Sequence, residues 1–248
     1  MGVPRPELSG SGRLEEVLRA GEAAGISEVE RCLIYAPDAV GKHVFDRCPG
    51  LLAKTRGVAP VIERLRSVFP PKTPVCFASM FTGASPEAHG IRAYERPVLE
   101  CDTLFDALIR AGKRPAIVSV EDASADVIFR GRSMDYFSEP SDGDVTSRAI
   151  ELIESDRHDF ILAYHQEYDD LLHESEPFAG DALAAASRHA AAFARLVEVA
   201  RERWAGKPYL VAFAPDHGAH VDPETGRGTH GDDIPGDMEV LHFFSFPR

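Results

Sequence analysis

Cysteine is scarce in this chain, and its few residues form no pairing pattern. They stand at Cys32, Cys48, Cys76 and Cys101, and no Cys-x-x-Cys sequence occurs. Thiols so few and so scattered exclude a disulfide framework. Long apolar runs are absent too: none approaches the roughly 20 residues that a membrane helix needs, and residues 1–26 lack the apolar segment of a signal peptide. We therefore expect free thiols, no membrane association and a cytoplasmic protein.

Positive charge is also in short supply. The chain has 27 Lys and Arg against 40 Asp and Glu, a net charge of −13, which argues against a nucleic-acid polymer as partner. Two motifs are missing as well. Without Gly-x-Ser-x-Gly a serine hydrolase is disfavoured, and without Gly-x-Gly-x-x-Gly after a strand so is a dinucleotide-dependent oxidoreductase.

Apolar runs alternate with helical patterns along most of the 248 residues, of which 44% are hydrophobic. This length is sufficient for one large hydrophobic core and is short for a second domain. Strands separated by helices predict an α/β fold with a mostly parallel sheet, helices on both faces and no large cap domain. We predict one domain over residues 1–248, with a core over about 30–248 and a helical extension over 1–29.

Local patterns place the individual elements. The predicted strands are Cys32–Ala36, Pro115–Val120, Phe160–Tyr164, Tyr209–Pro215 and Val240–Phe246. The predicted helices are Leu14–Ala24, Ala59–Val68, one that begins near Phe77 and ends at Thr82-Gly83, Thr103–Ala111, Asp144–Glu154 and Asp181–Trp204. The polar segment Glu121–Gly143 predicts an irregular surface excursion, with a short hairpin as an option.

Three short sequences in the C-terminal half combine aspartate with histidine. They are Asp169-x-x-x-His173, Asp216-His217, and His230 within Gly-Thr-His-Gly. The first two follow predicted buried strands, and loops that leave strand carboxyl ends in an α/β sheet converge on one crevice. Carboxylate together with imidazole suits Zn²⁺, Mn²⁺ or Fe²⁺ better than Ca²⁺ or Mg²⁺. These sequences therefore predict a metal cage.

Two upstream residues extend this set. Asp38 follows the first predicted strand, and Thr73 lies shortly before the Thr82-Gly83 turn. A threonine hydroxyl is a poor nucleophile at neutral pH and needs activation, which metal coordination supplies. Two ions about 3.5–4 Å apart can hold the attacking and leaving oxygens of a phosphoryl displacement. The residues together predict a two-metal phosphohydrolase.

The stretch from Lys72 to Ile91 resembles a known family. It contains Thr73 nine residues before the threonine of Thr82-Gly83, followed by Pro-Glu-x-His-Gly-Ile at 86–91. This arrangement resembles the nucleophile segment of the alkaline phosphatase superfamily, in its nucleotide pyrophosphatase/phosphodiesterase-like branch. The Asp and His sequences described above match the same family in order. The resemblance covers roughly residues 30 to 248, and five motifs in the right order are a strong signal where one alone is weak.

The resemblance implies a ligand assignment and a reaction. It gives one metal to Asp169, His173 and His230. It gives the other to Asp38, Thr73, Asp216 and His217. It implies that Thr73 attacks the phosphorus of a small soluble phosphate ester, and that water hydrolyses the resulting phosphothreonine. Zn²⁺ is the first choice for both ions, while Mn²⁺ and Fe²⁺ share these ligands.

The chain also departs from the family. Relatives often carry an asparagine three residues after the nucleophile, where this chain has Cys76; a thiol is a weaker hydrogen-bond donor than an amide. Lys72 and Arg92 are the candidate replacements by sequence proximity. Phe77, with Phe81 and Tyr94, suggests stacking on a ring of the substrate, and His220 is a further candidate substrate contact.

Several alternatives stay open at this stage. A phosphomonoesterase or a phosphonate hydrolase could use the same residues, and a cationic pocket rather than an aromatic one would favour the monoesterase. A non-catalytic metal-binding or interaction module is the alternative from another class, favoured by Cys76 and opposed by the complete ligand set. A phosphoglycerate-type mutase is disfavoured because the chain has no room for a second domain. A homo-oligomer is also left open.

Overall fold

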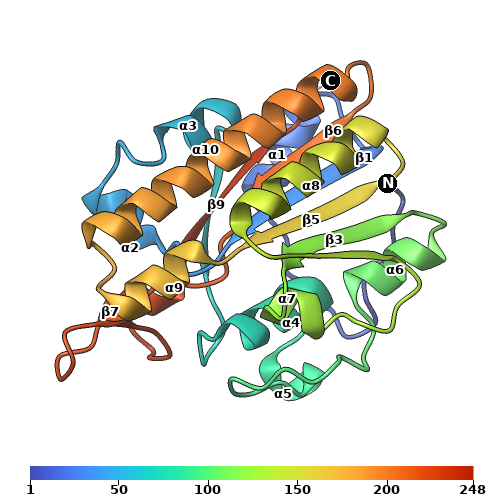
Figure 1. Cartoon of the computed structure of the whole chain (residues 1–248). Helices are drawn as coiled ribbons and strands as arrows, with labels where there is room; N and C mark the ends of the chain where they lie inside the picture. Colours follow the sequence, from blue (N-terminus) through green and yellow to red (C-terminus); the bar gives the residue numbers. More distant parts are fainter. Residues whose placement is uncertain (248) are drawn as a thin grey trace.

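The apolar runs of the sequence form the inner strands of a seven-stranded sheet in the computed structural model, which describes residues 1–247 (Figure 1). The sheet order is β2-β9-β6-β1-β5-β3-β4. Its strands are β1 (Arg31–Pro37), β2 (Val61–Arg66), β3 (Pro115–Val120), β4 (Asp135–Glu139), β5 (Phe160–His165), β6 (Tyr209–Phe213) and β9 (Glu239–Ser245). Two short strands, β7 (His220–Val221) and β8 (Gly228–Thr229), pair separately.

Pairing in the large sheet is mostly parallel. β1 pairs in parallel with β5 and β6, and β3 with β4 and β5, whereas β9 runs antiparallel to β6 and β2. β3 and β5 are buried along their whole length, as expected for inner strands covered on both faces. The predicted α/β architecture without a large cap domain is therefore confirmed.

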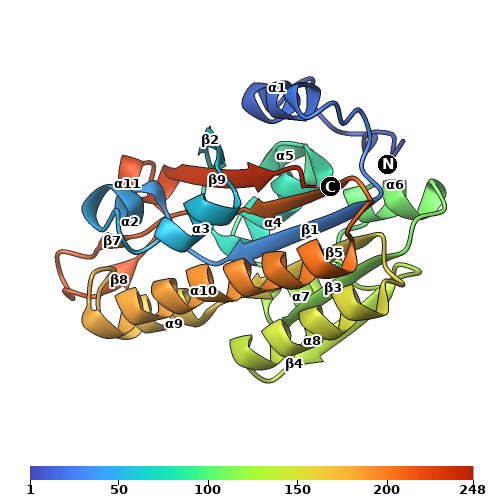
Figure 2. The same cartoon turned by 90° about the horizontal axis from the view of Figure 1, so that it is seen from above.

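Helices cover both faces of the sheet (Figure 2). The long α10 packs against α8, α9 and α3, while α1 and α5 lie on the opposite side of the sheet. The longer helices are α1 (Glu15–Ala23), α4 (Thr73–Thr82), α6 (Leu104–Arg110), α8 (Asp142–Ser155), α9 (Glu167–Glu174) and α10 (Gly180–Arg203). The shorter ones are α2 (Lys42–Arg47), α3 (Ala53–Val58), α5 (Pro86–His89), α7 (Ser124–Val127) and α11 (Pro235–Met238). No helix within residues 1–247 is both long enough and apolar enough to cross a membrane.

The prediction of a helix over Ala59–Val68 was wrong. The helix α3 ends at Val58, two residues before Pro60, and residues 61–66 form the edge strand β2. Apolar residues at 58, 62 and 65 have helical spacing, but adjacent β-branched Val61 and Ile62 favour a strand. Pairing with β9 then decides the outcome, and that contact is distant in the sequence.

Two further boundaries differ from the prediction. Helix α4 begins at Thr73 rather than near Phe77, because Pro74 is well tolerated in a first helical turn. It ends where predicted, at Gly83, whose φ of 67° is the left-handed conformation that favours glycine. The segment 121–143 is not irregular: it contains α7 and β4, and β4 pairs in parallel with β3 rather than in a hairpin.

Candidate metal centre

The carboxyl ends of β1 and β6 and the start of α4 bring the first group of candidate ligands together. Asp38 directly follows β1, Asp216 and His217 follow β6, and Thr73 begins α4. The Thr73 hydroxyl lies 3.2 Å from Asp38 Oδ2 and 3.4 Å from His217 Nε2. The same Nε2 lies 3.4 Å from Asp38 Oδ1 and 3.4 Å from Asp216 Oδ2. All four side chains are buried.

The second group is built by α9 and the loop after β8. Asp169 and His173 lie one turn apart on α9, and His230 follows β8. Asp169 Oδ1 lies 3.4 Å from His173 Nε2 and 3.5 Å from His230 Nε2. The His230 ring also stacks on His217 with a centroid separation of 4.1 Å, so the two groups adjoin.

The three histidines share one orientation: Nδ1 lies against a backbone carbonyl, and Nε2 faces a carboxylate. The Nδ1–carbonyl pairs are His173 with Gly228 (2.9 Å), His217 with Gly218 (3.0 Å) and His230 with Pro71 (2.8 Å). A carbonyl only accepts, so each Nδ1 carries the proton and each Nε2 keeps its lone pair. This is the arrangement that metal-ligating histidines adopt.

Two carboxylate oxygens in these groups are buried without a hydrogen-bond partner. They are Asp169 Oδ1 and Asp216 Oδ2. The other oxygen of Asp216 accepts the backbone N–H groups of Ala39 and His217, which turns Oδ2 toward His217 Nε2. Zinc ligands at about 2.0–2.1 Å from the ion lie roughly 3.3 Å apart in a tetrahedral site. The 3.4 and 3.5 Å separations in both groups therefore fit a bound divalent ion.

The electrostatics of the site point the same way. Burial raises the pKa of Asp38 well above its usual range, and the negative charges of Asp216 and Asp169 add to the rise. Burial likewise raises the pKa of Asp216. Burial and the neighbouring His217 lower the pKa of His230 to about 3, so this ring stays neutral. Crowded buried carboxylates beside the neutral His230 ring lack positive charge, which divalent ions supply.

Glycines allow the close backbone approaches that assemble the centre. A Cβ at Gly228 would lie 2.4 Å from the carbonyl oxygen of Leu172 on α9, and a Cβ at Gly218 would lie 2.1 Å from the Gly236 oxygen. Gly228 thus lets β8 pack against α9, which brings His230 next to Asp169. The glycines of Gly-Thr-His-Gly and Asp-His-Gly therefore have a packing role beside the ligands.

The predicted substrate contacts lie in different places. Lys72 reaches the centre, and its ammonium group donates to the carbonyl of His230. Cys76 lies with its sulfur 3.1 Å from Ser67 Oγ and lines a small cavity of about 170 Å³ beside Asp216. Phe77 is fully buried and packs on Phe81 and Tyr164 in the core.

The remaining predicted contacts lie at the periphery. His220 is held by buried Asp237, 2.8 Å from its Nδ1, while the predicted ring partner Tyr94 is 62% exposed. Asp237 also accepts the backbone N–H groups of Gly231 and Asp232, so it fixes the loop after His230. Sequence reasoning missed Asp237 as well as Tyr164, whose hydroxyl donates to Asp38; only the position of Tyr164 at a strand end signals it.

Comparisons with known proteins concern the family and the fold. Residues 51–103 match the model of the type I phosphodiesterase / nucleotide pyrophosphatase family. Murine ectonucleotide pyrophosphatase/phosphodiesterase 5 superposes with a TM-score of 0.62 at 19% identity, over 78% of this chain and 59% of that one. The chain therefore has an alkaline phosphatase-like fold. No curated protein matches the sequence.

Two further solved structures share this fold. Phosphonoacetate hydrolase from Sinorhizobium meliloti has a TM-score of 0.58 at 17% identity, over 77% of this chain and 57% of that one. The C-terminal periplasmic domain of phosphoethanolamine transferase from Campylobacter jejuni has a TM-score of 0.63 at 13% identity, over 88% of this chain and 80% of that one. The chain spans 59% and 57% of the length of the phosphodiesterase and of the phosphonate hydrolase.

Proposed function

We propose that the protein is a metal-dependent hydrolase of phosphoric ester or anhydride bonds that acts on small soluble substrates. A phosphodiesterase or nucleotide pyrophosphatase activity is the best supported form. The observation that carries the proposal is the common orientation of His173, His217 and His230, each with an unprotonated Nε2 directed at a buried carboxylate. Neither a solvated surface nor an ordinary core needs this arrangement.

The residues take separate roles. Asp169, His173 and His230 would hold one ion, and Asp38, Asp216 and His217, with the Thr73 oxygen, would hold the other. When bound, divalent ions polarise phosphoryl oxygens and favour deprotonation of the threonine hydroxyl and of water. Zn²⁺ is the first choice for this ligand set, with Mn²⁺ and Fe²⁺ next.

Thr73 is the proposed nucleophile. Its hydroxyl donates toward Asp38, which is itself held by Tyr164, so the oxygen is aimed into the centre. Because α4 begins at Thr73, the positive end of its helix dipole lies where phosphate charge would be bound. Thr73 would form the bond to phosphorus as the ester oxygen leaves, and water would then hydrolyse the phosphothreonine. A threonine-to-alanine variant of the murine phosphodiesterase is inactive and was solved in complex with AMP, which supports this role.

Lys72 favours a second candidate, a phosphomonoesterase or phosphonate hydrolase. Its ammonium group lies beside His230, whereas Phe77 and Phe81 are buried and present no open ring to a base. A cation suits a dianionic monoester, and an apolar wall suits the second ester group of a diester.

Paired assays with a bis-aryl phosphate diester and the matching monoester distinguish these forms. The zinc-loaded chain is compared with Thr73→Ala under identical conditions. Faster diester turnover that disappears in the variant supports the phosphodiesterase, and faster monoester turnover moves the assignment to the second candidate. Turnover that survives in Thr73→Ala refutes the nucleophile, and no turnover of either substrate leaves a specialised substrate or the non-catalytic module.

A further inference from the structure

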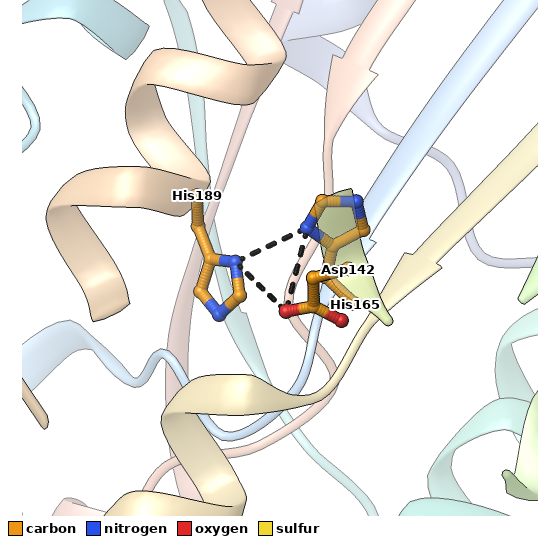
Figure 3. Close-up of side chains that lie close together, drawn as sticks. All are labelled: Asp142, His165 and His189. Atoms are coloured by element: carbon orange, nitrogen blue, oxygen red, sulfur yellow. Dashed lines mark hydrogen bonds and ion pairs between the residues drawn. The ribbon is translucent and has the colours of Figure 1, made fainter. Parts of the chain in front are cut away.

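A third cluster of aspartate and histidine lies outside the candidate metal centre (Figure 3). Asp142 begins α8, His165 ends β5 and His189 lies on α10. The two Nδ1 atoms are 3.3 Å apart and lie 3.6 and 3.7 Å from Asp142 Oδ2. The hydroxyl of Tyr35 on β1 lies 2.8 Å from His165 Nδ1 and 3.2 Å from His189 Nδ1. Both histidines and Tyr35 are fully buried.

The spacing resembles a metal site, but the protons on His189 exclude one. The backbone N–H of Tyr168 donates to His189 Nε2 at 3.3 Å, so Nε2 carries the lone pair and Nδ1 carries the proton. A metal on Nδ1 would require the opposite tautomer, with a proton on Nε2 directed at an N–H group. His189 has the same tautomer as His173, His217 and His230, but those rings direct the free Nε2 at a carboxylate, whereas His189 directs the protonated Nδ1.

The other ring completes a neutral hydrogen-bond network. The Thr146 hydroxyl donates to the Asp142 carbonyl, so it accepts from His165 Nε2 at 3.2 Å. His165 Nδ1 is then free to accept the Tyr35 hydroxyl. The protonated Nδ1 of His189 faces the Tyr35 oxygen and the Asp142 carboxylate. Every ring nitrogen has a complementary partner, with no cation required.

The outward contacts of this cluster converge on the start of α9. Asp142 accepts two consecutive backbone N–H groups, from Gln166 to Oδ1 and from Glu167 to Oδ2, both at 3.0 Å. His189 accepts the next, from Tyr168. The first amides of a helix have no partner within the helix, and the Gln166 side chain does not cap α9. Side chains from α8 and α10 thus supply the cap.

We propose that Asp142 and His189 are positioning residues for the Asp169, His173 and His230 group. Asp169 is the residue after Tyr168, so the cap fixes the turn of α9 that carries the carboxylate. The same cluster is tied to the other group, because the carbonyl of His165 accepts the N–H of Asp38 at 2.8 Å. The positioning role rests on the proposed function, because it assumes that Asp169, His173 and His230 bind metal. The capping of α9 by Asp142 and His189 does not depend on that assumption.

The test pairs variants that remove the cap with variants that keep it. His189→Leu removes the acceptor for Tyr168, while His189→Gln offers an amide oxygen at a similar reach. Asp142→Ala removes both other acceptors. Arg188→Gln is the matched control, because it breaks the exposed ion pair to Glu167 near the same turn and leaves the cap intact.

Amide hydrogen exchange of the metal-free protein reads the cap directly. The expected result is faster exchange at residues 166–168 in His189→Leu and Asp142→Ala, but not in His189→Gln or Arg188→Gln. Calorimetric titration with Zn²⁺ reads the consequence. We expect two ions per wild-type chain, and one of the two sites weakened roughly ten- to a hundredfold in the uncapped variants.

Each contrary outcome is distinct. Unchanged exchange and unchanged zinc affinity in both His189→Leu and Asp142→Ala would overturn the positioning role. A third zinc ion that disappears in His165→Leu would overturn the tautomers and make the cluster a metal site. A wild-type chain that binds no zinc would overturn the proposed function and the ligand-positioning role together, and hydrogen exchange would then judge the cap alone.

Discussion

Two regions of this molecule, the candidate metal centre and the cluster of Asp142, His165 and His189, use the same types of side chain in different roles. In the candidate metal centre, His173, His217 and His230 direct an unprotonated Nε2 at buried carboxylates. About the same spacing occurs around Asp142, yet His189 accepts a backbone N–H on Nε2 and turns its protonated Nδ1 toward the carboxylate. Distances among ligand types therefore do not define a metal site. What each ring meets on its far side decides whether a lone pair is free.

The largest effect should come from His230→Gln in the candidate metal centre, with His189→Gln in the Asp142 cluster as the comparison. His230→Gln removes a neutral ligand nitrogen, and we expect turnover of the preferred aryl phosphate to fall by about 10³-fold or more. His189→Gln keeps the acceptor for Tyr168, so its turnover should stay close to that of the wild type. Steady-state rates at saturating Zn²⁺ check both variants; equal losses would erase the contrast between the two regions.

Metal removal should lower the Tm of the protein through the candidate metal centre and not through the cluster around Asp142. Binding only to the folded state stabilises by about 2.7 kcal/mol at a free metal concentration of 100 Kd. For a chain of this size that corresponds to a rise in Tm of roughly 5–10 °C. Thermal unfolding with zinc and with a chelator measures it. The rise should persist in His189→Gln and shrink in His217→Gln, and a rise that is equal in both would contradict the assignment.

A methyl group at Gly228 should disturb the metal centre alone. The added Cβ would meet the Leu172 carbonyl on α9, and we expect a loss of about 1–3 kcal/mol in the free energy of unfolding. The carbonyl of Gly228 also holds His173 Nδ1, so zinc affinity should fall too. Urea unfolding and zinc titration measure the two effects. Gly180→Ala, where nothing lies within 4 Å of an added Cβ, is the control that should change little.

The cluster of Asp142, His165 and His189 should add a pH dependence to the stability of the protein. Burial lowers the pKa of His165 and of His189 to about 3, so both rings stay neutral in the folded chain while they titrate near 6.5 when unfolded. Between these values the unfolded chain binds more protons, and stability falls as the pH falls. Each histidine should contribute about 1.4 kcal/mol per pH unit below 6.5.

Urea unfolding of metal-free protein at pH 7 and pH 5 measures this slope. His189→Gln should reduce it by the share of one histidine, and Arg188→Gln should leave it unchanged. A slope that is the same in all three proteins would show that His189 does not stay neutral when folded.

Prediction from sequence succeeded for elements that are formed by neighbouring residues or that lie in a uniformly apolar environment. Strand Pro115–Val120 was predicted with its observed bounds because an inner strand of a parallel sheet is apolar throughout. Edge strand β2 was misread as a helix, since its residues are only partly buried and its single partner strand, β9, is distant in the sequence. The candidate ligands were found because Asp and His sequences follow buried strands. Asp142 and His189 gave no signal, because they stand 47 residues apart on separate helices.

The sequence alone therefore determined the α/β architecture, the superfamily resemblance and the candidate ligand residues, because periodicity and motif spacing are properties of neighbouring residues. Tertiary structure alone decided that β2 is a strand, that Phe77 belongs to the core and which histidine nitrogens are free. Those outcomes depend on what packs against a residue from elsewhere in the chain. A tautomer in particular is set by the hydrogen bond on the far nitrogen, and the partner in that bond is brought by the fold.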